Sequence, residues 1–455
     1  MRGFLIFLFM AGAAAQEAGR GLGIDGAVAR AIDRYGAVRV SAEQVAAAAH
    51  GIQLARTAYL PQADYIAQLN RATRNNVFGM LLPQGVIAPI SGPPLAENSM
   101  TNVWGSATGL LVSWEPFDFG LRQARVDAAG AGQRRAEAAL ARTKFEIASV
   151  TADTFLTVLA AEQTMRTAQA TIARSRALAE VIGAQVRAEL RPGADLARIH
   201  AETAMAEAQL IQAEQAVAMA KANLSQFVAE APAGLHPEAG RLLDPPPAAV
   251  LAQADLALHP AAREQDAALN EAKARAKILD RSYYPRFNVQ GTTYARGTGA
   301  NANFTTGGAF SGFGPNIVNW GAGLSMTFPI GALPGLRVQR QMEATRTRME
   351  MQRQEQLRQD LAAQLARAEA QFAGARRLVE KIPAQVQAAR AVELQSTARY
   401  RAGLGTIAEV AEAQRLVAQG EIDLSLSHLA VWRAMLAISA AQGDLEPFLK
   451  AAAGK

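Results

Sequence analysis

Two glutamates near the C-terminal end of the sequence have the type and spacing of a charged site. Glu409 and Glu412 are three residues apart, and in a helix this spacing places both side chains on one face. If copies of the chain were arranged around an axis, these carboxylates would form a ring that attracts cations and resists closure, because like charges would be brought together. The alternative is a pair of solvated glutamates on a helix surface.

Other residues that commonly carry chemistry are badly spaced for it. The five histidines are His50, His200, His236, His259 and His428. None is paired with another at the i,i+3 or i,i+4 spacing, which gives little support to a metal or nucleophilic site built on histidine. The sequence has no phosphate-binding G-x-x-x-x-G-K-[ST] motif and no G-x-S-x-G motif. We therefore expect no enzyme activity, no cofactor and no metal site.

The composition excludes further classes of protein. The chain has 455 residues, half of them apolar, and no cysteine, which excludes disulfide frameworks, thiolate metal sites, thiol nucleophiles and a lipid on an N-terminal cysteine. The 46 basic and 40 acidic residues give a net charge of +6. This surplus is too small and too dispersed for a nucleic-acid surface, so no nucleic-acid partner is expected.

The first 15 residues have the order of a secretory signal peptide. Arg2 precedes an apolar run over residues 4–10, and the small residues Ala13, Ala14 and Ala15 follow. We expect cleavage after Ala15, since so short a run cannot cross a membrane core that needs about 20 residues in a helix. No later stretch of about 18 uninterrupted apolar residues exists, so we expect no spanning helix and export into or beyond the periplasm.

The two halves of the chain resemble each other in landmarks that occur in the same order. The matching segments are 59–61 and 283–285, 109–114 and 323–328, and 186–190 and 400–404. We infer a first repeat over 16–229, a proline-rich linker over 230–258, a second repeat over 259–444 and a C-terminal tail over 445–455. Each repeat is predicted to contain a helix, a β-hairpin (about 59–116 and 283–330) and a long helix pair (117–229 and 336–442).

Long helices are predicted from composition and periodicity. Residues 118–186 contain no proline and are rich in good helix formers, so they would form one helix about 100 Å long. Apolar or small residues recur there in steps of three and four, which is typical of coiled coils. The second half repeats this design over 336–401, where Pro383 predicts a kink or a break, and then over 406–442.

Membrane β-strands are the second type of secondary structure that the sequence predicts. In 319–328 the apolar residues alternate with small or polar ones, and an aromatic residue stands at each end, about the length of a membrane strand. The lipid-facing candidates are Trp320, Leu324, Met326 and Phe328, with Trp104 and Trp114 in the weaker copy of the first half. The partner strand over 62–71 alternates poorly. The alternative is a pair of soluble hairpins that cap a helical domain.

The number of strands predicts an assembly. Four strands cannot sit in lipid as an open sheet, because their edge N–H and C=O groups would lack partners. Three chains would supply twelve strands, enough to close a barrel. We therefore expect a homotrimer of mixed, mainly α class, with a periplasmic α-barrel of coiled-coil helices and a membrane β-barrel in contact with outer-membrane lipid.

Together these features resemble the TolC-like outer-membrane factor (outer membrane efflux protein) family, over residues 22–444. The resemblance rests on the duplicated helix–hairpin–helix order, the two Tyr-x-Pro strand entries and the segment 400–413. It implies the exit duct of a tripartite efflux pump or a type I secretion system, which docks on a periplasmic adaptor and, through it, an inner-membrane transporter. A periplasmic coiled-coil adaptor or scaffold without a channel is the alternative.

The resemblance also implies roles for residues of the two helix-to-helix turns. The adaptor-docking candidates are Arg187, Leu190, Arg401, Gly403, Leu404 and Thr406. Glu409 and Glu412 match the paired acidic residues that constrict the duct entrance, and Asp195, at the position equivalent to Glu409, would add a second ring. Gly405 stands where the family has a basic latch residue, so a latch of that kind is not expected here.

Overall fold

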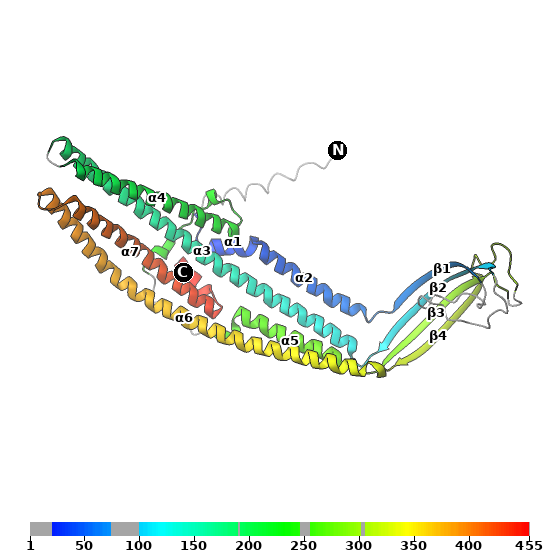
Figure 1. Ribbon diagram of the computed structural model, residues 1–455. Helices are drawn as coiled ribbons and strands as arrows, with labels where there is room; N and C mark the ends of the chain where they lie inside the picture. The colour runs from blue at the N-terminus through cyan, green and yellow to red at the C-terminus, as the bar shows by residue number, and fades with distance from the viewer. Residues whose placement is uncertain (1–20, 74–99, 190–191, 246–254, 302–304, 455) are drawn as a thin grey trace, which may run out of the picture. The chain divides into compact units, whose positions relative to one another are not determined.

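The computed structural model describes residues 21–73, 100–189, 192–245, 255–301 and 305–454. The predicted signal peptide, most of the loop between the first two strands and Leu190 lie outside these residues. The helices are α1 (Ile24–Arg34), α2 (Gly36–Thr57), α3 (Leu121–Arg187), α4 (Gly193–Val228), α5 (Pro260–Arg281), α6 (Leu333–Arg401), α7 (Ile407–Gln442) and α8 (Glu446–Ala453). The strands are β1 (Gln62–Thr73), β2 (Asn102–Phe117), β3 (Arg286–Thr298) and β4 (Ile317–Thr327) (Figure 1).

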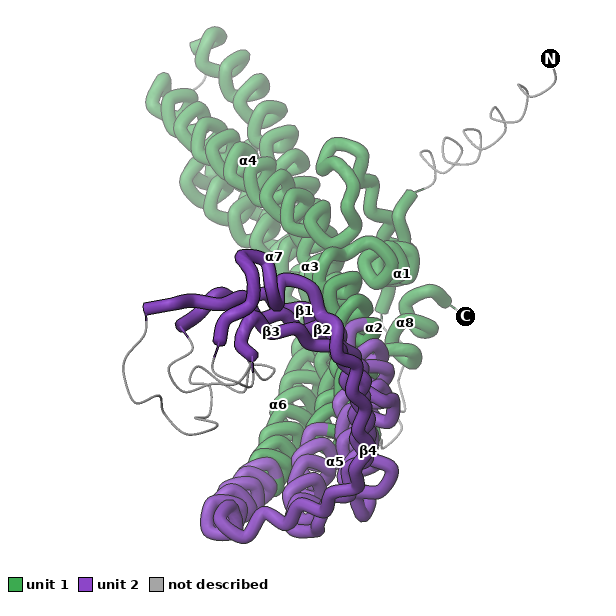
Figure 2. Tube along the Cα trace, turned by 90° about the vertical axis from the view of Figure 1, so that its right-hand side faces the viewer, with its two compact units in different colours: residues 1–46, 134–267, 351–455 green, residues 47–133, 268–350 purple. Residues whose placement is uncertain are grey.

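The chain forms two compact units, and each takes residues from both sequence repeats (Figure 2). One unit comprises residues 1–46, 134–267 and 351–455 and is helical in its described part. The other comprises residues 47–133 and 268–350 and contains all four strands with the adjoining helix ends. The division therefore follows the two textures of the sequence rather than its two halves.

The four strands form one antiparallel sheet in the order β1-β2-β3-β4. The β2–β3 ladder joins the two repeats, with Leu110 opposite Thr293, and the β3–β4 ladder places Val289 opposite Leu324. The only irregularity in the β2–β3 pairing lies between Trp114 and Phe117. Within the described residues β1 and β4 are the edge strands, each paired on one side only. The sheet has four strands, as the sequence predicts.

The end of β4 differs from the prediction by one residue. The strand stops at Thr327, so Phe328 lies just beyond it rather than inside it. Pro329 has φ −83° and ψ 58°, and the amide of Ile330 donates to the carbonyl of Phe328 at 2.9 Å. These values describe an inverse γ-turn, which ends the ladder and leads into α6.

An ion pair fixes the corner between β2 and α3. Asp118 accepts hydrogen bonds from the amides of Gly120 and Arg122, and its carboxylate pairs with the Arg122 guanidinium at 3.0 Å. Both side chains are buried, and the guanidinium stacks on the ring of Tyr59, 4.7 Å from its centre. Tyr59 of the first Tyr-x-Pro landmark thus has a structural role, and Tyr284, the middle residue of the second landmark, stacks on Phe119 of the same corner.

The long helices are confirmed. Helix α3 has 67 residues and α6 has 69, and α6 continues through Pro383 without the break that the sequence allowed. Alanine and arginine are the most frequent residues of α3, alanine, arginine and glutamine are the most frequent of α6, and all three types favour the helical state. A proline inside a helix removes one backbone hydrogen bond, which is tolerable where the rest of the helix is supported.

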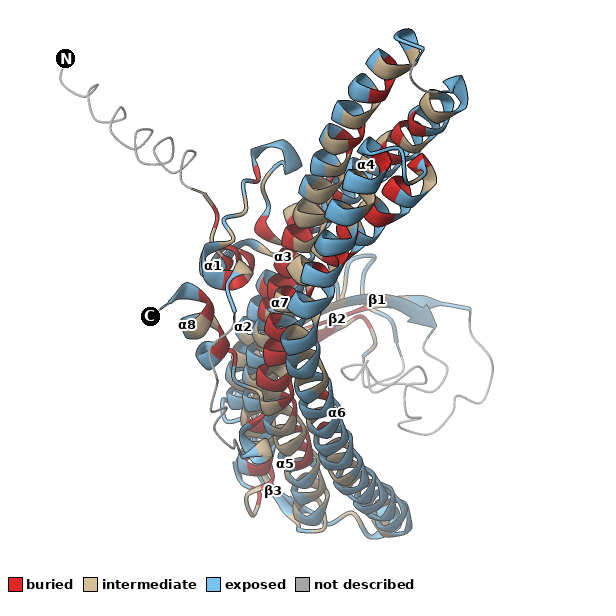
Figure 3. Cartoon of the chain, turned by 90° about the vertical axis from the view of Figure 1, so that its left-hand side faces the viewer, coloured by how far each residue is buried: buried red, intermediate tan, exposed pale blue. Residues whose placement is uncertain are grey.

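The helical unit has a buried core where α3, α4, α7 and α8 meet (Figure 3). Phe155 of α3, Leu224 of α4, Trp432 of α7 and Phe448 of α8 are each almost completely buried there. Trp432 and Phe448 meet edge to face with their ring centres 6.2 Å apart. The segment predicted as a C-terminal tail therefore contributes a helix to the core.

Helix α7 is apolar enough to pass a composition test for a membrane span. More than half of its most apolar stretch is buried within the protein. A helix whose apolar residues are buried against other parts of the same chain has the properties of a core helix. Charged residues such as Glu421 and Arg433 interrupt the apolar residues of α7, so the helix is not an uninterrupted apolar run.

Candidate functional site

Two backbone hydrogen bonds close the turn between α6 and α7. Gly403 has a φ of +77°, its amide donates to the carbonyl of Tyr400 at 3.0 Å, and the amide of Leu404 donates to the carbonyl of Arg399 at 2.8 Å. This is a Schellman motif, in which glycine adopts the left-handed conformation at little cost. The turn therefore holds Leu404, 72% exposed, at its outer side, with Arg401 exposed beside it.

Helix α7 begins with a side-chain cap. The hydroxyl oxygen of Thr406 accepts from the amide of Glu409 at 3.3 Å, and the same hydroxyl donates to the Glu409 carboxylate. Thr406 and Glu409 thus form a variant of the capping box, S/T-x-x-E. The motif was visible in the sequence, where both residues had been given only functional roles.

The turn between α3 and α4 shares one backbone feature with the turn between α6 and α7, a left-handed residue after the first helix, here a glutamate. Glu189, the counterpart of Gly403, has a φ of +61°, and its amide donates to the carbonyl of Val186 at 3.0 Å. Arg187 is the exposed last residue of α3. Helix α4 begins after Pro192 without a side-chain cap. Two segments far apart in sequence thus match in this backbone feature, and both turns lie at the same end of the helical unit (Figure 1).

The three predicted constriction carboxylates all lie beside these turns. Asp195 and Glu409 are each the third residue of their helix, where a negative charge interacts favourably with the helix dipole. Asp195 accepts a hydrogen bond from the hydroxyl of Tyr400 at 3.1 Å. Glu412 forms an ion pair with Arg415, with two contacts of 2.7 and 3.1 Å. Each carboxylate therefore has a partner within the chain.

The charge of Glu412 is favoured by its neighbour. The hydrogen bond from the Arg415 guanidinium lowers the pKa of the Glu412 carboxyl below its usual value. Glu409 and Glu412 are both exposed and lie three residues apart on α7, as predicted. Both carboxylates are consequently accessible to ions from solvent.

A small apolar cluster joins the two helical hairpins behind the turns. It consists of Ile182 of α3, Ile199 of α4, Tyr400 of α6, and Ile407 and Val410 of α7, all buried. The sequence analysis had matched Tyr400 to Val186 without assigning it a role. Its ring fills this cluster while its hydroxyl reaches Asp195, so one side chain links both hairpins by packing and by a hydrogen bond.

A second link between the hairpins is ionic. Glu421 of α7 accepts from both terminal nitrogens of Arg174 of α3 at 3.1 Å, and its other oxygen accepts from Arg390 of α6 at 3.0 Å. Glu421 is partly buried, so this pairing is less screened by water than a surface pair. No short sequence pattern could have revealed it, because Arg174 and Glu421 are 247 positions apart.

The sheet has one apolar and one polar face. Cross-strand partners share a face, so the register assigns the sides of all four strands. The apolar face carries Ala63, Tyr65, Ala67, Leu69, Leu110, Val112, Trp114, Val289, Ala295, Trp320, Ala322, Leu324 and Met326. The polar face carries Asp64, Gln68, Asn70, Ser113, Asn288, Gln290, Thr292, Arg296, Asn319, Ser325 and Thr327.

The predicted lipid-facing residues fall together on the apolar face. Trp104, Trp114, Trp320, Leu324 and Met326 all lie there, and Trp320 is 83% exposed. Strand β1 alternates better than its sequence suggested, and Ile66 on the polar face is the residue that obscured its pattern. The sequence predicts the polar side of the last strand, over 319–327, and the register extends this polar face to the other three strands.

The described residues contain no group of three or more histidine and acidic side chains that could hold a metal ion. His259 is a structural residue in the helical unit. Its Nδ1 accepts from the amide of Ala261 at 3.1 Å and its Nε2 lies 3.2 Å from the carbonyl of Ala440, which fits a neutral ring. Burial lowers the pKa of the His259 ring, consistent with these contacts.

Comparison with solved structures gives outer-membrane channels of the same fold. The chain is 14% identical to CusC, with a TM-score of 0.75 and 92% of each chain covered. It is 15% identical to VceC of Vibrio cholerae, with a TM-score of 0.71 and coverage of 92% and 96%, and 13% identical to CmeC of Campylobacter jejuni, with a TM-score of 0.72 and coverage of 92% and 85%. A search of curated protein sequences gave no match.

The sequence profile of the family described as outer membrane efflux protein matches residues 27–230 and 251–444. These two segments cover most of the chain. The family and the solved relatives are channels rather than enzymes or scaffolds, which favours the duct over the alternative of a periplasmic adaptor. The chain therefore belongs to the outer membrane efflux protein family and is an outer-membrane exit duct with a long periplasmic extension.

Proposed function

We propose that three copies of this chain form a passive conduit for efflux, closed as a twelve-strand barrel in the outer membrane and continued by the helices in the periplasm. The two-faced sheet carries this proposal. Its apolar face suits contact with lipid, its polar face suits a water-filled lumen, and both of its edges require partners. Joining β1 of one chain to β4 of the next would satisfy all three demands.

The polar face suits a conduit of low selectivity. Its charged residues include Asp64 and Arg296, and most of the remainder are amides, hydroxyls or glycine. Such a surface hydrates solutes without binding one class strongly. Selection of the cargo would therefore lie with an inner-membrane transporter that reaches this duct through a periplasmic adaptor.

The helix-to-helix turns support a role for the helical end as the entrance. Leu404 is an exposed apolar residue on a turn held by backbone hydrogen bonds, which suits a fixed contact point for the adaptor. Threefold symmetry would gather Glu409, Glu412 and Asp195 around the axis as carboxylate rings. The tyrosine link to Asp195 and the pairing of Glu421 would then resist separation of the two hairpins, and thus opening of the entrance.

Cysteine cross-linking tests the predicted junction between subunits, since the natural chain has no cysteine. Gly323 on the polar face of β4 is changed to cysteine in combination with Asp64→Cys, Ile66→Cys or Gln68→Cys on the polar face of β1. We expect one of these pairs to give dimer and trimer bands under oxidation, because a disulfide forms only where Cβ atoms approach to about 4 Å.

The matched control uses the opposite face of β1. Ala63→Cys, Tyr65→Cys and Ala67→Cys lie on the apolar face and should not cross-link to the cysteine at position 323. Cross-links of equal yield from both faces, or none from the whole set in outer-membrane fractions, would contradict the proposed barrel.

A further inference from the structure

An arginine lies on the apolar face of the sheet, at the end remote from Tyr59 and Tyr284. Arg71 is paired with Trp104 across the β1–β2 ladder, so both side chains lie on the face that carries Leu110 and Trp114. A charged group on such a face is costly in hydrocarbon and is expected only near the membrane surface or beside a partner. Arg71 lies near the end of the β1–β2 ladder, two pairs before its last, which is where a membrane surface would lie if the sheet spans the membrane.

The guanidinium of Arg71 is held in a fixed orientation. Its carbon atom lies 5.1 Å from the centre of the Trp104 ring, and its Nε donates to the side-chain oxygen of Asn102 at 2.6 Å. Within the described residues no carboxylate forms an ion pair with it. Because Asn102 binds Nε, the two terminal nitrogens are the donors that remain for a ligand. Together they form the planar fork that binds two oxygens of a phosphate.

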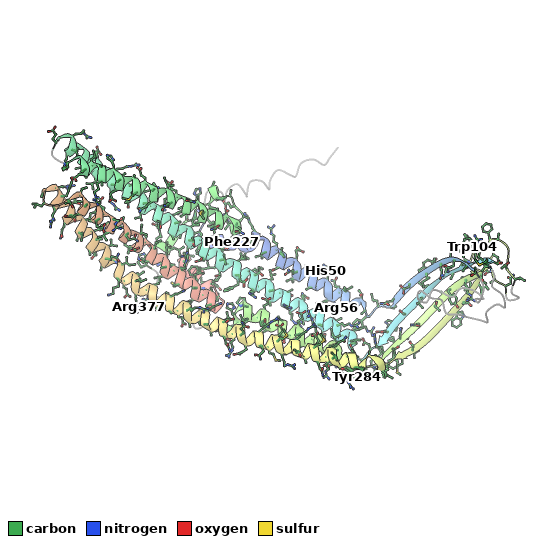
Figure 4. All side chains as sticks on the ribbon, viewed as in Figure 1. His50, Arg56, Trp104, Phe227, Tyr284 and Arg377 are labelled. Atoms are coloured by element: carbon green, nitrogen blue, oxygen red, sulfur yellow. The ribbon has the colours of Figure 1, made fainter. Side chains whose placement is uncertain are left out.

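Aromatic side chains extend this surface beyond the strands. Phe313 meets Trp104 edge to face with ring centres 5.4 Å apart, and Phe310 meets Phe313 in the same way at 6.3 Å. Phe310 is 78% exposed. Both phenylalanines belong to the loop between β3 and β4. Figure 4 shows Trp104 at the end of the sheet from which this loop emerges. The three rings and Arg71 thus combine an apolar and a cationic surface at one place.

Backbone packing keeps the loop in this position. Gly312 has a φ of +84°, and a side chain there would collide with the amide of Gly299 and the carbonyl of Trp104. The amide of Gly299 in turn donates to that carbonyl at 2.8 Å. Only glycine allows so close an approach, so the sequence positions Phe313 against Trp104.

We propose that Arg71, Trp104, Phe310 and Phe313 form a binding site for the phosphate headgroup of an outer-membrane lipid. The proposal rests on the proposed orientation of the sheet, in which its apolar face contacts lipid and this end faces the exterior. Continuity with the apolar face favours a lipid over a soluble anion, since the acyl chains would lie along Leu110 and Leu69 while the phosphate meets Arg71. Pairing of β1 with another strand leaves this face accessible, because strand pairing uses the backbone edge.

Titration of the full-length protein in detergent tests the site. Dilauroyl phosphatidic acid is added to the wild type and to Arg71→Gln, and bound lipid is counted by native mass spectrometry. We expect the variant to bind this lipid about tenfold more weakly, the scale of one charge-assisted contact, and to bind dilauroylglycerol, which has the same acyl chains but no phosphate, as the wild type does. Phe313→Ser should weaken the binding of both lipids by a few fold, about the effect of one lost ring contact.

Arg296→Gln is the matched control, since Arg296 lies in the same sheet on the polar face. Equal loss in both arginine variants, no loss in Arg71→Gln, or displacement of the lipid by inorganic phosphate at equal concentration would overturn the proposal. Channel conductance in phosphatidylcholine bilayers separates this result from the proposed function. Arg71→Gln should conduct normally, whereas a wild type without conductance would contradict the duct itself.

Discussion

The two helix-to-helix turns of the helical unit have similar backbones built from different residues. Gly403 and Glu189 occupy equivalent positions, and both have a positive φ. The α6–α7 turn has a glycine at its left-handed position and Thr406 as a cap, whereas the α3–α4 turn has a glutamate there and Pro192 before its second helix. The two turns thus share a left-handed residue at matching positions, while the side chains that stabilise them differ.

The carboxylates show the same divergence. Asp195 and Glu409 retain the third position of their helices, but Asp195 is bound by Tyr400 of the other hairpin and Glu409 by the cap of its own helix. Glu412 is the sixth residue of α7, and its counterpart in α4 by the repeat alignment is Arg198. One turn is thus tied to its neighbour, and the other is stabilised within itself.

The largest effect is expected from removing the tie. Tyr400→Ala should lower the local free energy of opening at both turns by about 3 kcal/mol, because it empties a buried aromatic position and removes the hydrogen bond to Asp195. Tyr400→Phe keeps the ring and should lose only about 1 kcal/mol. Hydrogen–deuterium exchange of α3, α4, α6 and α7 measures both, and equal exchange in the two variants would show that packing is unimportant here.

The left-handed position gives the next effect. Gly403→Ala should weaken the α6–α7 turn by about 1 kcal/mol, because a Cβ is disfavoured in that conformation. Glu189→Gly should strengthen the α3–α4 turn by less, since glycine also increases the entropy of the unfolded chain. Exchange of the last-turn amides of α6 and α3 reports the two changes. Opposite signs are required if the turns are equivalent.

Loss of the helix cap should change the stability of the two turns by a similar or smaller amount. Thr406→Ala should destabilise the first turn of α7 by about 1 kcal/mol, since an orphan amide loses its acceptor. Pro192→Ala removes no side-chain cap and should leave the first turn of α4 nearly unchanged. Amide exchange at residues 408–410 and 194–196 provides the comparison, and a large effect at Pro192 would argue against it.

The smallest effect on stability is expected at Glu412, where solvent screens the ion pair with Arg415. The pKa of Glu412 is lowered in the folded protein, so its contribution is present above the unfolded pKa and is lost as the pH falls through the folded pKa. Its larger consequence would be on ion flow. Replacing Glu409 and Glu412 together with Gln should reduce cation preference in planar bilayers at neutral pH.

Glu355→Gln is the control for this pair of substitutions. Glu355 forms the same i,i+3 ion pair with Arg358 on α6 and is equally exposed to solvent. If the Glu409 and Glu412 double variant conducts like the wild type, or if Glu355→Gln changes selectivity to the same degree, both carboxylates lie away from the pore axis.

The helices and the strand count could be predicted because local composition and alternation determine them. Helix α3 was predicted within a few residues, and its composition alone excludes a strand. The polar face of the sheet was obscured by exceptions such as Ile66, and it became clear only when the register aligned all four strands. Alternation within one strand is a weak signal, whereas agreement across a sheet is a strong one.

Contacts between distant segments were beyond sequence reasoning. The pairing of Arg174 with Glu421 and the bond between Tyr400 and Asp195 depend on how two hairpins pack, which no short motif encodes. The Thr406–Glu409 cap could have been found, since its spacing is a known helix signal.

Two neighbouring threonines of β3 provide the most direct test that the sheet is the wall of a conducting pore. Thr292 lies on the polar face, opposite Gly321, and Thr293 lies on the apolar face, opposite Trp320. Each is changed to cysteine, and single-channel conductance is recorded before and after a charged, membrane-impermeant thiol reagent is added. The account predicts a conductance change with Thr292→Cys and none with Thr293→Cys, whereas the reverse pattern or an equal response at both positions would contradict it.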